Sequence, residues 1–588
     1  MKKWLSLVCV MILAGGLTAC TKKKNTSEKV LNLVTPMKFA GYDPAFAADL
    51  YSGNETTRVY EGLLEYHYLK RPYTLQPNLA EAMPVVSADG LTYTFKILKG
   101  VKFHDSPAFS GGKGRELVAE DFVYSFKRLA DPKLQSTGWW LLDGKIKGLN
   151  EWRKKYENAA AANYDDIIDG LKATDANTLV ITLAKPFPQF LYALAMPFTV
   201  VVAKEAVIHF GKEFLNHPVG TAAFILPEYD QSNTITYLKN PNYREKTYPS
   251  DGEAGDKEKG LLESAGKKLP LVDKVVVQIM VEDQPRWLNL QKGAIDYAAI
   301  PKDNFSSTVQ KDKTLVKELA DKGMALEWAP QLDVTYIAFN HDNKLFKDNI
   351  KLRRAMSLAY DEVKGNELFY NGTGLSAQSV VPPGIAGYVA DFKNPWRQFN
   401  LEQAKKLLAE AGYPGGKGLP KLSYDTTSNT VSRQMGEFFA KNMEELGIKI
   451  EVISNTWPEL VKKTNNKSTM LFGIAWGADY PDAENFLQLL YCPNKAPGSN
   501  SSNYCNPEFD KLFAQASVMQ DSPERTALYE QAYKLAADQV PWIFGLHRTN
   551  FYIRNGWLKN LKLTEFTHGQ EKYLDVDTNS KTELSKKL

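Results

Sequence analysis

Apolar and polar residues alternate with a period of two in several short segments of the chain. In residues 91–104, LTYTFKILKGVKFH, the side chains of Tyr93 and Phe95 fall on one face and polar residues on the other. Such alternation predicts a half-buried strand. Apolar runs between turn residues predict further strands at 177–188 and 273–281.

Other segments carry apolar residues at helical spacing, with signals for where each helix begins and ends. The segment 119–132 is one of them, and its terminal proline stops the helix. A second helix is predicted between Asn400, which is suited to cap its N-terminus, and Gly412, which ends it. A third begins after Ser522 and ends before Pro541. Strands and helices together indicate a mixed α and β protein.

Residues 243–269 break this regular pattern. The segment YREKTYPSDGEAGDKEKGLLESAGKKL is rich in charge and glycine and has no sustained periodicity. Such composition predicts an exposed loop or a loosely ordered insertion rather than a linker between domains.

The first residues carry the marks of an exported protein. Lys2 and Lys3 precede a short apolar stretch and then small residues that lead to Cys20, which predicts a signal peptide at 1–19. The ending LTAC resembles the lipobox of bacterial lipoproteins, so Cys20 is expected to carry lipid on a tether at 20–27. The alternative is a plain signal peptide in which this cysteine is incidental.

The remaining cysteines and the net charge add two constraints. Cys492 and Cys505 flank a loop rich in Pro, Gly, Ser and Asn, which favours a disulfide in an oxidising compartment. Two buried thiols are the alternative, and no histidine lies near to suggest zinc. The formal charge of +4 gives no reason to propose a nucleic-acid partner.

The chain holds no motif typical of an enzyme. HExxH, GxGxxG after a strand, GxxxxGK[ST] and GxSxG are all absent from the sequence. The seven histidines are scattered singly, without the spacing of metal ligands. Binding is therefore a better class than catalysis, and no metal or cofactor is expected.

Several stretches in order along the chain resemble one family. They include YDPAFAADLYSGNETTRVYEGLLEY, LQPNLAEAMPVVSADGLTYTFKILKGVKFHDS, LVAEDFVYSFKRLADP, DANTLVITLAKPFPQFL and FNHDNKLFKDNIKLRRAMSLAYD. Together they look like the landmarks of family 5 extracellular solute-binding proteins, the receptors of peptide and nickel ABC importers. The greatest likeness is to oligopeptide-binding proteins.

The resemblance implies an α/β, two-lobed periplasmic-binding-protein-like fold of type II, with an extra inserted domain and a ligand cleft between the lobes. The first lobe would hold Domain I and the inserted Domain II, and the second lobe would be Domain III. The implied limits are 28–66, 199–330 and 553–588 for Domain I, 67–198 for Domain II and 331–552 for Domain III. Two crossings between the lobes would form a hinge.

A carboxylate near the end of an apolar run stands out in MLFGIAWGADYPD, residues 470–482. The part AWGADYPD resembles the family segment whose aspartate accepts the free α-amino group of a bound peptide. By this resemblance Asp479 is the amine anchor, Trp476 lines a side-chain pocket and Tyr480 lies beside them. The alternative is that Asp479 caps a turn or pairs with a structural arginine.

Two further segments resemble the family more weakly, and one position differs from the family pattern. ISNTWPELVKK resembles a family segment whose tryptophan enters a side-chain pocket, which nominates Trp457, with a core role as the alternative. YDTTSNT nominates Thr427 and Asn429, with a surface turn as the alternative. Where related receptors can carry a basic residue for the peptide carboxylate, this chain has Gly473.

The implied function is capture of oligopeptides and delivery to an ABC permease with its ATPase, by a monomer that is exported and lipid-anchored in the cell envelope. It would act in the periplasmic space or on the outer face of the plasma membrane. Three alternatives remain open. The same fold could bind a nickel chelate, haem, an opine or an oligosaccharide; it could serve as a sensor or adhesin; or the protein could hydrolyse peptides.

Overall fold

The computed structural model describes residues 28–588 apart from three short gaps, which are 37–40, 48 and 228–232. The predicted signal peptide 1–19, the lipidated Cys20 and the tether 20–27 therefore lie outside the described residues. No helix in the described part is both long enough and apolar enough to cross a membrane.

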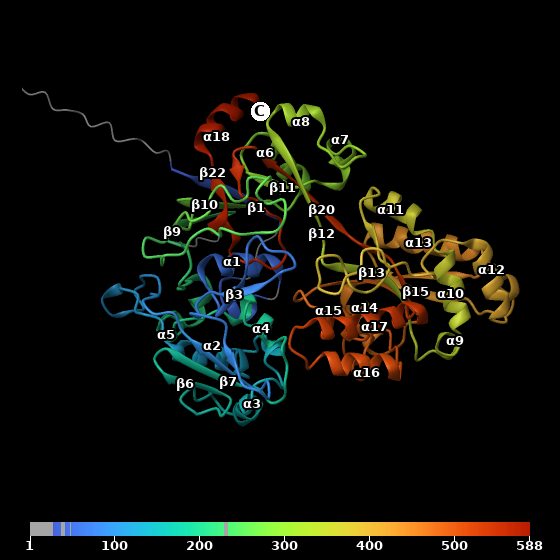
Figure 1. Cartoon of the computed structure of the whole chain (residues 1–588), viewed down its shortest axis with the longest axis horizontal. Coiled ribbons are helices and arrows are strands. Elements are labelled where there is room, and N and C mark those ends of the chain that lie inside the picture. The colour runs from blue at the N-terminus through green and yellow to red at the C-terminus, as the bar shows by residue number, and fades with distance from the viewer. Residues whose placement is uncertain (1–27, 37–40, 48, 228–232) are drawn as a thin grey trace, which may run out of the picture.

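Two lobes, joined by a pair of adjacent chain segments, make up the molecule (Figure 1). Strand β12 (Met324–Pro330) of the first lobe pairs antiparallel with β20 (Thr549–Asn555). Directly beyond this pair, the backbone N–H of Gln331 donates to the carbonyl of Arg548 at 2.7 Å. Both crossings therefore lie side by side, and residues between them, 333–547, form the second lobe.

Two sheets form the frame of the first lobe. One has the order β1-β10-β9-β8, with β1 parallel to β10 at its edge; its strands are β1 (Val30–Thr35), β8 (Phe224–Ile225), β9 (Thr234–Lys239) and β10 (Lys274–Ile279). The other has the order β11-β20-β12, where β11 is Tyr297–Ala299. The surrounding helices are α1 (Leu50–Val59), α5 (Lys204–Phe210), α6 (Asp283–Gln291), α7 (Phe305–Thr308), α8 (Lys317–Asp321) and α18 (Thr578–Leu584).

A smaller antiparallel sheet with the order β4-β5-β7-β6 belongs to the same lobe. Its strands are β4 (Val85–Val86), β5 (Thr92–Lys96), β6 (Leu171–Asp175) and β7 (Thr178–Thr182). Helix α2 (Ala119–Ala130) packs on it, and α3 (Leu149–Tyr156) and α4 (Phe190–Ala193) lie nearby (Figure 1). We call this sheet, its three helices and the segments that connect them, residues 85–193, the α2 unit.

The second lobe is built on a five-stranded sheet with the order β16-β15-β17-β13-β18. Its strands are β13 (Asp333–Phe339), β15 (Leu422–Thr427), β16 (Ile450–Asn455), β17 (Leu471–Gly477) and β18 (Trp542–Phe544). The helices of this lobe are α9 (Lys344–Lys347), α10 (Ile350–Ala359), α11 (Glu362–Tyr370), α12 (Leu401–Glu410), α13 (Thr430–Glu444), α14 (Trp457–Asn465), α15 (Ala483–Leu487), α16 (Pro507–Ala516) and α17 (Pro523–Gln539).

Both faces of this sheet are covered by apolar cores. Along β13, Val334 and Tyr336 belong to one buried cluster, whereas Ile337 and Phe339 belong to another. Because successive side chains of a strand point to opposite faces, the two clusters lie on opposite sides of the sheet. Strand β13 is therefore buried on both faces.

The regular elements predicted from periodicity are confirmed. The strand within 91–104 is β5 and the helix within 119–132 is α2. Asn400 caps α12 by accepting from the backbone N–H of Gln403 at 3.0 Å. Ser522 caps α17, as its position before Pro523 predicts.

The predicted loop at 243–269 is confirmed, and it carries many exposed side chains together with a few buried ones. It forms no helix or strand, but Asp256 is fully buried and Ser264 nearly so. The ammonium of Lys562, near the C-terminus, lies 2.8 Å from both carboxylate oxygens of Asp256. The segment is therefore held against the C-terminal part of the first lobe by a buried ion pair.

Candidate functional site

A cavity of about 540 Å³ lies between the two lobes. The first lobe contributes Leu33 and Val34 of the edge strand β1, together with Glu565. Gly477 and Ala478, at the end of β17, line it from the second lobe. A cavity whose walls come from both lobes changes shape when the lobes move about the crossings.

In the described part of the chain, one edge of strand β17 lacks a ladder partner over most of its length, and its last residue, Gly477, lines this cavity. Within the described residues, β13 pairs with β17 along its whole length, whereas β15 pairs only with Leu471 and Phe472. The residues from Gly473 to Gly477 thus have a ladder partner on one side alone. A Cβ added at Gly477 would meet no atom within 4 Å. An extended chain can add to such an edge through backbone hydrogen bonds.

Asp479 directly follows this open edge and is held by a single neighbour. Its carboxylate accepts from the side-chain amide of Asn485 at 3.0 Å, and its own N–H donates to the amide oxygen of Asn485 at 3.1 Å. The indole N–H of Trp476 donates to the same oxygen at 3.0 Å. Burial raises the pKa of Asp479, and the bond from Asn485 opposes this in part.

No cation pairs with Asp479 in the described part of the chain. The acid that caps a helix and pairs with an arginine is instead Asp482, three residues later. Its carboxylate oxygens accept from Arg525 at 2.8 and 2.9 Å. Asp479 is therefore a half-buried carboxylate that has a hydrogen bond but, among the described residues, no counter-charge.

A second cavity, of about 350 Å³, contains Asp479 in its wall. The second lobe also contributes Tyr480 and Glu484, and the α2 unit contributes Lys145 and Lys185 from the other side. Tyr480 donates to Glu484 at 2.6 Å. This cavity, like the larger one, lies at the interface between the lobes.

The ring of Tyr480 also makes contact across the interface. It stacks on Tyr192 of α4 with ring centroids 5.6 Å apart and planes 5° from parallel. Tyr192 stacks in turn on Tyr66 at 6.4 Å. Trp476 packs against the core cluster on one face of the second-lobe sheet rather than into either cavity.

The remaining predicted contacts do not line either cavity. Trp457 is the first residue of α14 and is 55% exposed. Asn429 caps α13 by accepting from the N–H of Ser432 at 2.8 Å, and the hydroxyl of Thr427 donates to the Ser432 hydroxyl at 2.9 Å. This arrangement fits the alternative interpretation of Thr427 and Asn429 as a surface turn.

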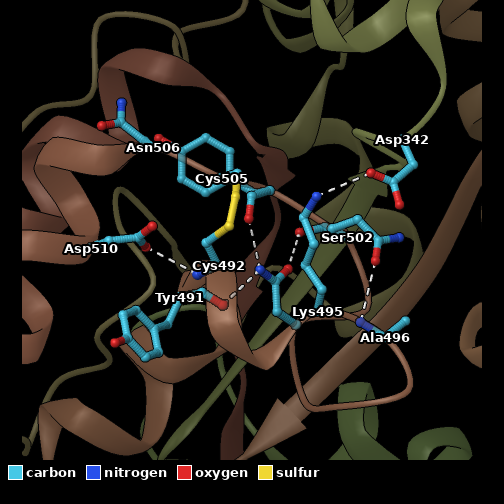
Figure 2. The surroundings of a disulfide bond; sticks show 12 residues. Asp342, Tyr491, Cys492, Lys495, Ala496, Ser502, Cys505, Asn506 and Asp510 are labelled. Atoms are coloured by element: carbon cyan, nitrogen blue, oxygen red, sulfur yellow. Dashed lines mark hydrogen bonds and ion pairs between the residues drawn. A yellow bond between two sulfur atoms is a disulfide. The ribbon is translucent and has the colours of Figure 1, made fainter.

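Cys492 and Cys505 form a disulfide in the structure (Figure 2). The backbone N–H of Cys492 donates to Asp510 at 3.0 Å, which ties the bridge to α16. Within the bridged loop, the side-chain amide of Asn500 donates to the carbonyls of Tyr491 and Tyr504 at 3.1 and 2.9 Å. The loop follows directly on the segment that carries Asp479.

Replacing Cys492 and Cys505 together by serine is expected to lower the free energy of unfolding by about 3 kcal/mol, because a bridge over a short loop restricts the unfolded chain. Urea unfolding of the variant and of the oxidised wild type measures the difference. Reduced wild type should have the same free energy of unfolding as the variant. Equal values for the variant, the oxidised wild type and the reduced wild type would contradict a disulfide between Cys492 and Cys505.

Sequence reasoning missed two charged groups at the base of the larger cavity. Asp333 accepts from the N–H of Arg548 at 2.9 Å and also pairs with its guanidinium. Glu565 accepts from the N–H of Leu332 at 2.9 Å. Burial, with the nearby charge of Asp333, raises the pKa of Glu565 to about 7. No local pattern marks these residues, because they meet only where the two crossings come together.

Glu565 gives the protein a pH-dependent stability. Because folding raises its pKa from 4.5 to about 7, the folded state loses stability as the pH rises through that interval. Glu565→Gln removes this loss. The free energy of unfolding of the variant, relative to that of the wild type at the same pH, should therefore rise by up to about 3 kcal/mol from pH 4 to pH 8. Urea unfolding of both proteins at both pH values measures this rise. If the two proteins differ in stability by the same amount at pH 4 and pH 8, the raised pKa of Glu565 is contradicted.

One family model and several known proteins match this chain over most of its length. The model of the bacterial extracellular solute-binding proteins, family 5, matches residues 74–498. Heme-binding protein A of Haemophilus influenzae is 30% identical over 546 residues, which are 92% of this chain and 90% of that protein. The dipeptide-binding protein of Escherichia coli is 28% identical over 91% of this chain and 92% of its own length.

Solved structures show the same likeness in three dimensions. HbpA2 from Haemophilus parasuis has a TM-score of 0.75 at 24% identity, covering 93% of this chain and all of that one. The periplasmic binding protein DppA from Helicobacter pylori, in complex with the peptide STSA, has a TM-score of 0.67 at 24% identity and covers 94% and 99%.

Proposed function

The chain belongs to the bacterial extracellular solute-binding proteins of family 5, and on this basis we propose that it captures peptides with a free amino terminus for an ABC importer. Members of this family are solute-binding receptors, not enzymes. The family predicted from the ordered stretches is thus confirmed, and so is the two-lobed α/β fold.

The observation that carries the proposal is the half-buried carboxylate of Asp479, which has no cation beside it among the described residues and lines a cavity between the lobes. An ionised group taken out of water without a counter-charge is costly. The ammonium of a peptide removes that cost and adds a charge-assisted hydrogen bond. The amide of Asn485 already orients the carboxylate, so little ordering is needed when the ligand arrives.

The open edge of β17 supports an extended ligand. A peptide that pairs with residues 473–477 is bound through its backbone, and such bonds do not depend on its side chains. The cavity of about 540 Å³ beside this edge is within the usual range for small-ligand sites. Closure of the lobes about Gln331 and Arg548 would then enclose the peptide.

In the proposed role, the receptor passes the bound peptide to the permease of the importer. Lipid on Cys20 would hold the receptor in the cell envelope near its permease, and the closed, loaded form would present both lobes to that permease. The ATPase of the importer would supply the work of transport. The receptor itself would act as a monomer without a cofactor.

A second candidate cargo is haem, because a haem-binding protein is among the relatives. The residues that line the larger cavity include Tyr51, Tyr73, Tyr297 and Tyr552 but no His, Cys or Met. An aromatic cavity can hold a flat apolar ligand, and a tyrosine can act as its axial ligand. The unpaired carboxylate of Asp479 has no use in this alternative.

A thermal-shift panel separates the two cargo classes. Mature protein is heated with peptides of two to six residues, with hemin, and with nickel chelates and oligosaccharides. A ligand at about 100 times its dissociation constant adds about 2.7 kcal/mol of stability. The proposal predicts a shift with peptides. A shift with hemin alone would transfer the function to haem capture.

A further inference from the structure

Charged side chains from both lobes face one another across the cavity of about 350 Å³. The second lobe supplies the carboxyl groups of Asp479 and Glu484, and the α2 unit supplies the ammonium groups of Lys145 and Lys185. Glu484 and Lys145 are near enough for each to shift the pKa of the other. The cavity thus has an acidic wall and a basic wall.

The basic wall lacks anions. In the described part of the chain, neither Lys145 nor Lys185 has a carboxylate within ion-pair distance or a hydrogen-bond acceptor for its ammonium. Lys145 instead lies over the ring of Phe187, with its nitrogen 4.0 Å from the ring centroid. Burial lowers the pKa of Lys145, and the charge of Lys185 lowers it further. An anion placed between Lys145 and Lys185 would stabilise the charged form of Lys145 against both burial and the charge of Lys185.

The acidic wall cannot neutralise both lysines once a ligand is bound. An ammonium on Asp479 cancels that charge, which leaves Glu484 alone. Burial raises the pKa of Glu484 to about 7, so this group is only partly ionised at neutral pH. A cavity with peptide bound at Asp479 therefore keeps a net positive charge on the side of Lys145 and Lys185.

Gln189 adds an unsatisfied polar group to the same wall. The residue is 1% exposed and lines the cavity. Neither its amide oxygen nor its amide nitrogen has a hydrogen-bond partner among the described residues. Buried amides are normally hydrogen-bonded, so this wall holds an amide that none of the described residues satisfies.

We propose that the cavity receives an acidic side chain on the first residue of the bound peptide, with its carboxylate between Lys145 and Lys185. The inference rests on the proposed function, because Asp479 must hold the α-ammonium of the same residue. The α2 unit would then select the ligand, and the receptor would prefer peptides that begin with Asp or Glu.

The test compares the tripeptide amides Glu-Ala-Ala and Gln-Ala-Ala, in which the side chain of Glu is the only carboxylate. Calorimetric titration of the wild type should show a preference for the Glu peptide of about tenfold or more. In the double variant Lys145→Met and Lys185→Met, the ratio of the two affinities should fall to about one. Ala-Glu-Ala and Ala-Gln-Ala amides should bind the wild type equally, which places the preference at the first residue.

Lys147→Met is the matched control, because Lys147 is an exposed lysine of the same segment and does not line the cavity. It should keep the wild-type ratio. A ratio near one in the wild type, or a preference that survives the double variant, would overturn the inference while peptide binding stands. If neither peptide binds the wild type, the proposed function fails first and the inference falls with it.

Discussion

Asp479→Asn is expected to weaken the binding of a free-amine peptide by about 100-fold or more. The ammonium of the ligand would lose its counter-charge in a buried site, and an unpaired buried charge costs about 3 to 5 kcal/mol. The amide of Asn keeps the shape of the side chain, so the change removes charge and little else. Calorimetric titration with one tripeptide measures the loss.

The control for this variant is Asp391→Asn, which makes the same chemical change at an exposed position of the second lobe. It should bind the tripeptide as the wild type does. Asp479→Asn should also unfold at least as high in temperature as the ligand-free wild type, because the charge it removes is half-buried and has no cation beside it among the described residues. Peptide affinity within about threefold of the wild type would show that the ammonium binds elsewhere.

Gly473→Ala is expected to destabilise the second lobe by roughly 1 to 3 kcal/mol or more. A Cβ at this position would lie 1.9 Å from the hydroxyl oxygen of Tyr424, which itself is buried. Either the sheet or the tyrosine must shift. The same contact explains why glycine suits this position.

Gly477→Ala is a matched control on the same strand, since an added Cβ there meets no atom within 4 Å. Urea unfolding should leave this variant close to the wild type. Tyr424→Phe placed in the Gly473→Ala background should recover part of the loss, because it removes the clashing oxygen. Equal stability of the two alanine variants would contradict the packing described for β17.

Local signals explain which elements could be predicted from the sequence. Helices α12 and α17 were predicted because their caps, Asn400 and Ser522, and their apolar spacing lie within one segment. The loop at 243–269 is also predicted, but the burial of its Asp256 is not, because that residue pairs with Lys562, which is about 300 residues away in the chain. No local pattern reveals such a partner.

In the candidate site, too, local sequence signals reveal some features, and others depend on residues far away in the chain. The sequence singles out Asp479 near the end of an apolar run, but it could not show that Asp482 takes the arginine and that Asp479 is held by Asn485 instead. The nominations of Trp457, Thr427 and Asn429 rested on likeness alone. Whether those loops reach the cavity depends on how the lobes pack, and in the structure they do not line it.

The most direct test of the central claim changes the ligand and leaves the protein intact. One tripeptide and its N-acetylated twin are titrated calorimetrically into the mature wild type, with hemin as a third ligand. Acetylation removes the ammonium and keeps every backbone group that pairs with β17. Tight binding of the free peptide and a loss of about 100-fold on acetylation is the predicted result. Equal binding of the two peptides, or binding of hemin alone, would contradict peptide capture at Asp479.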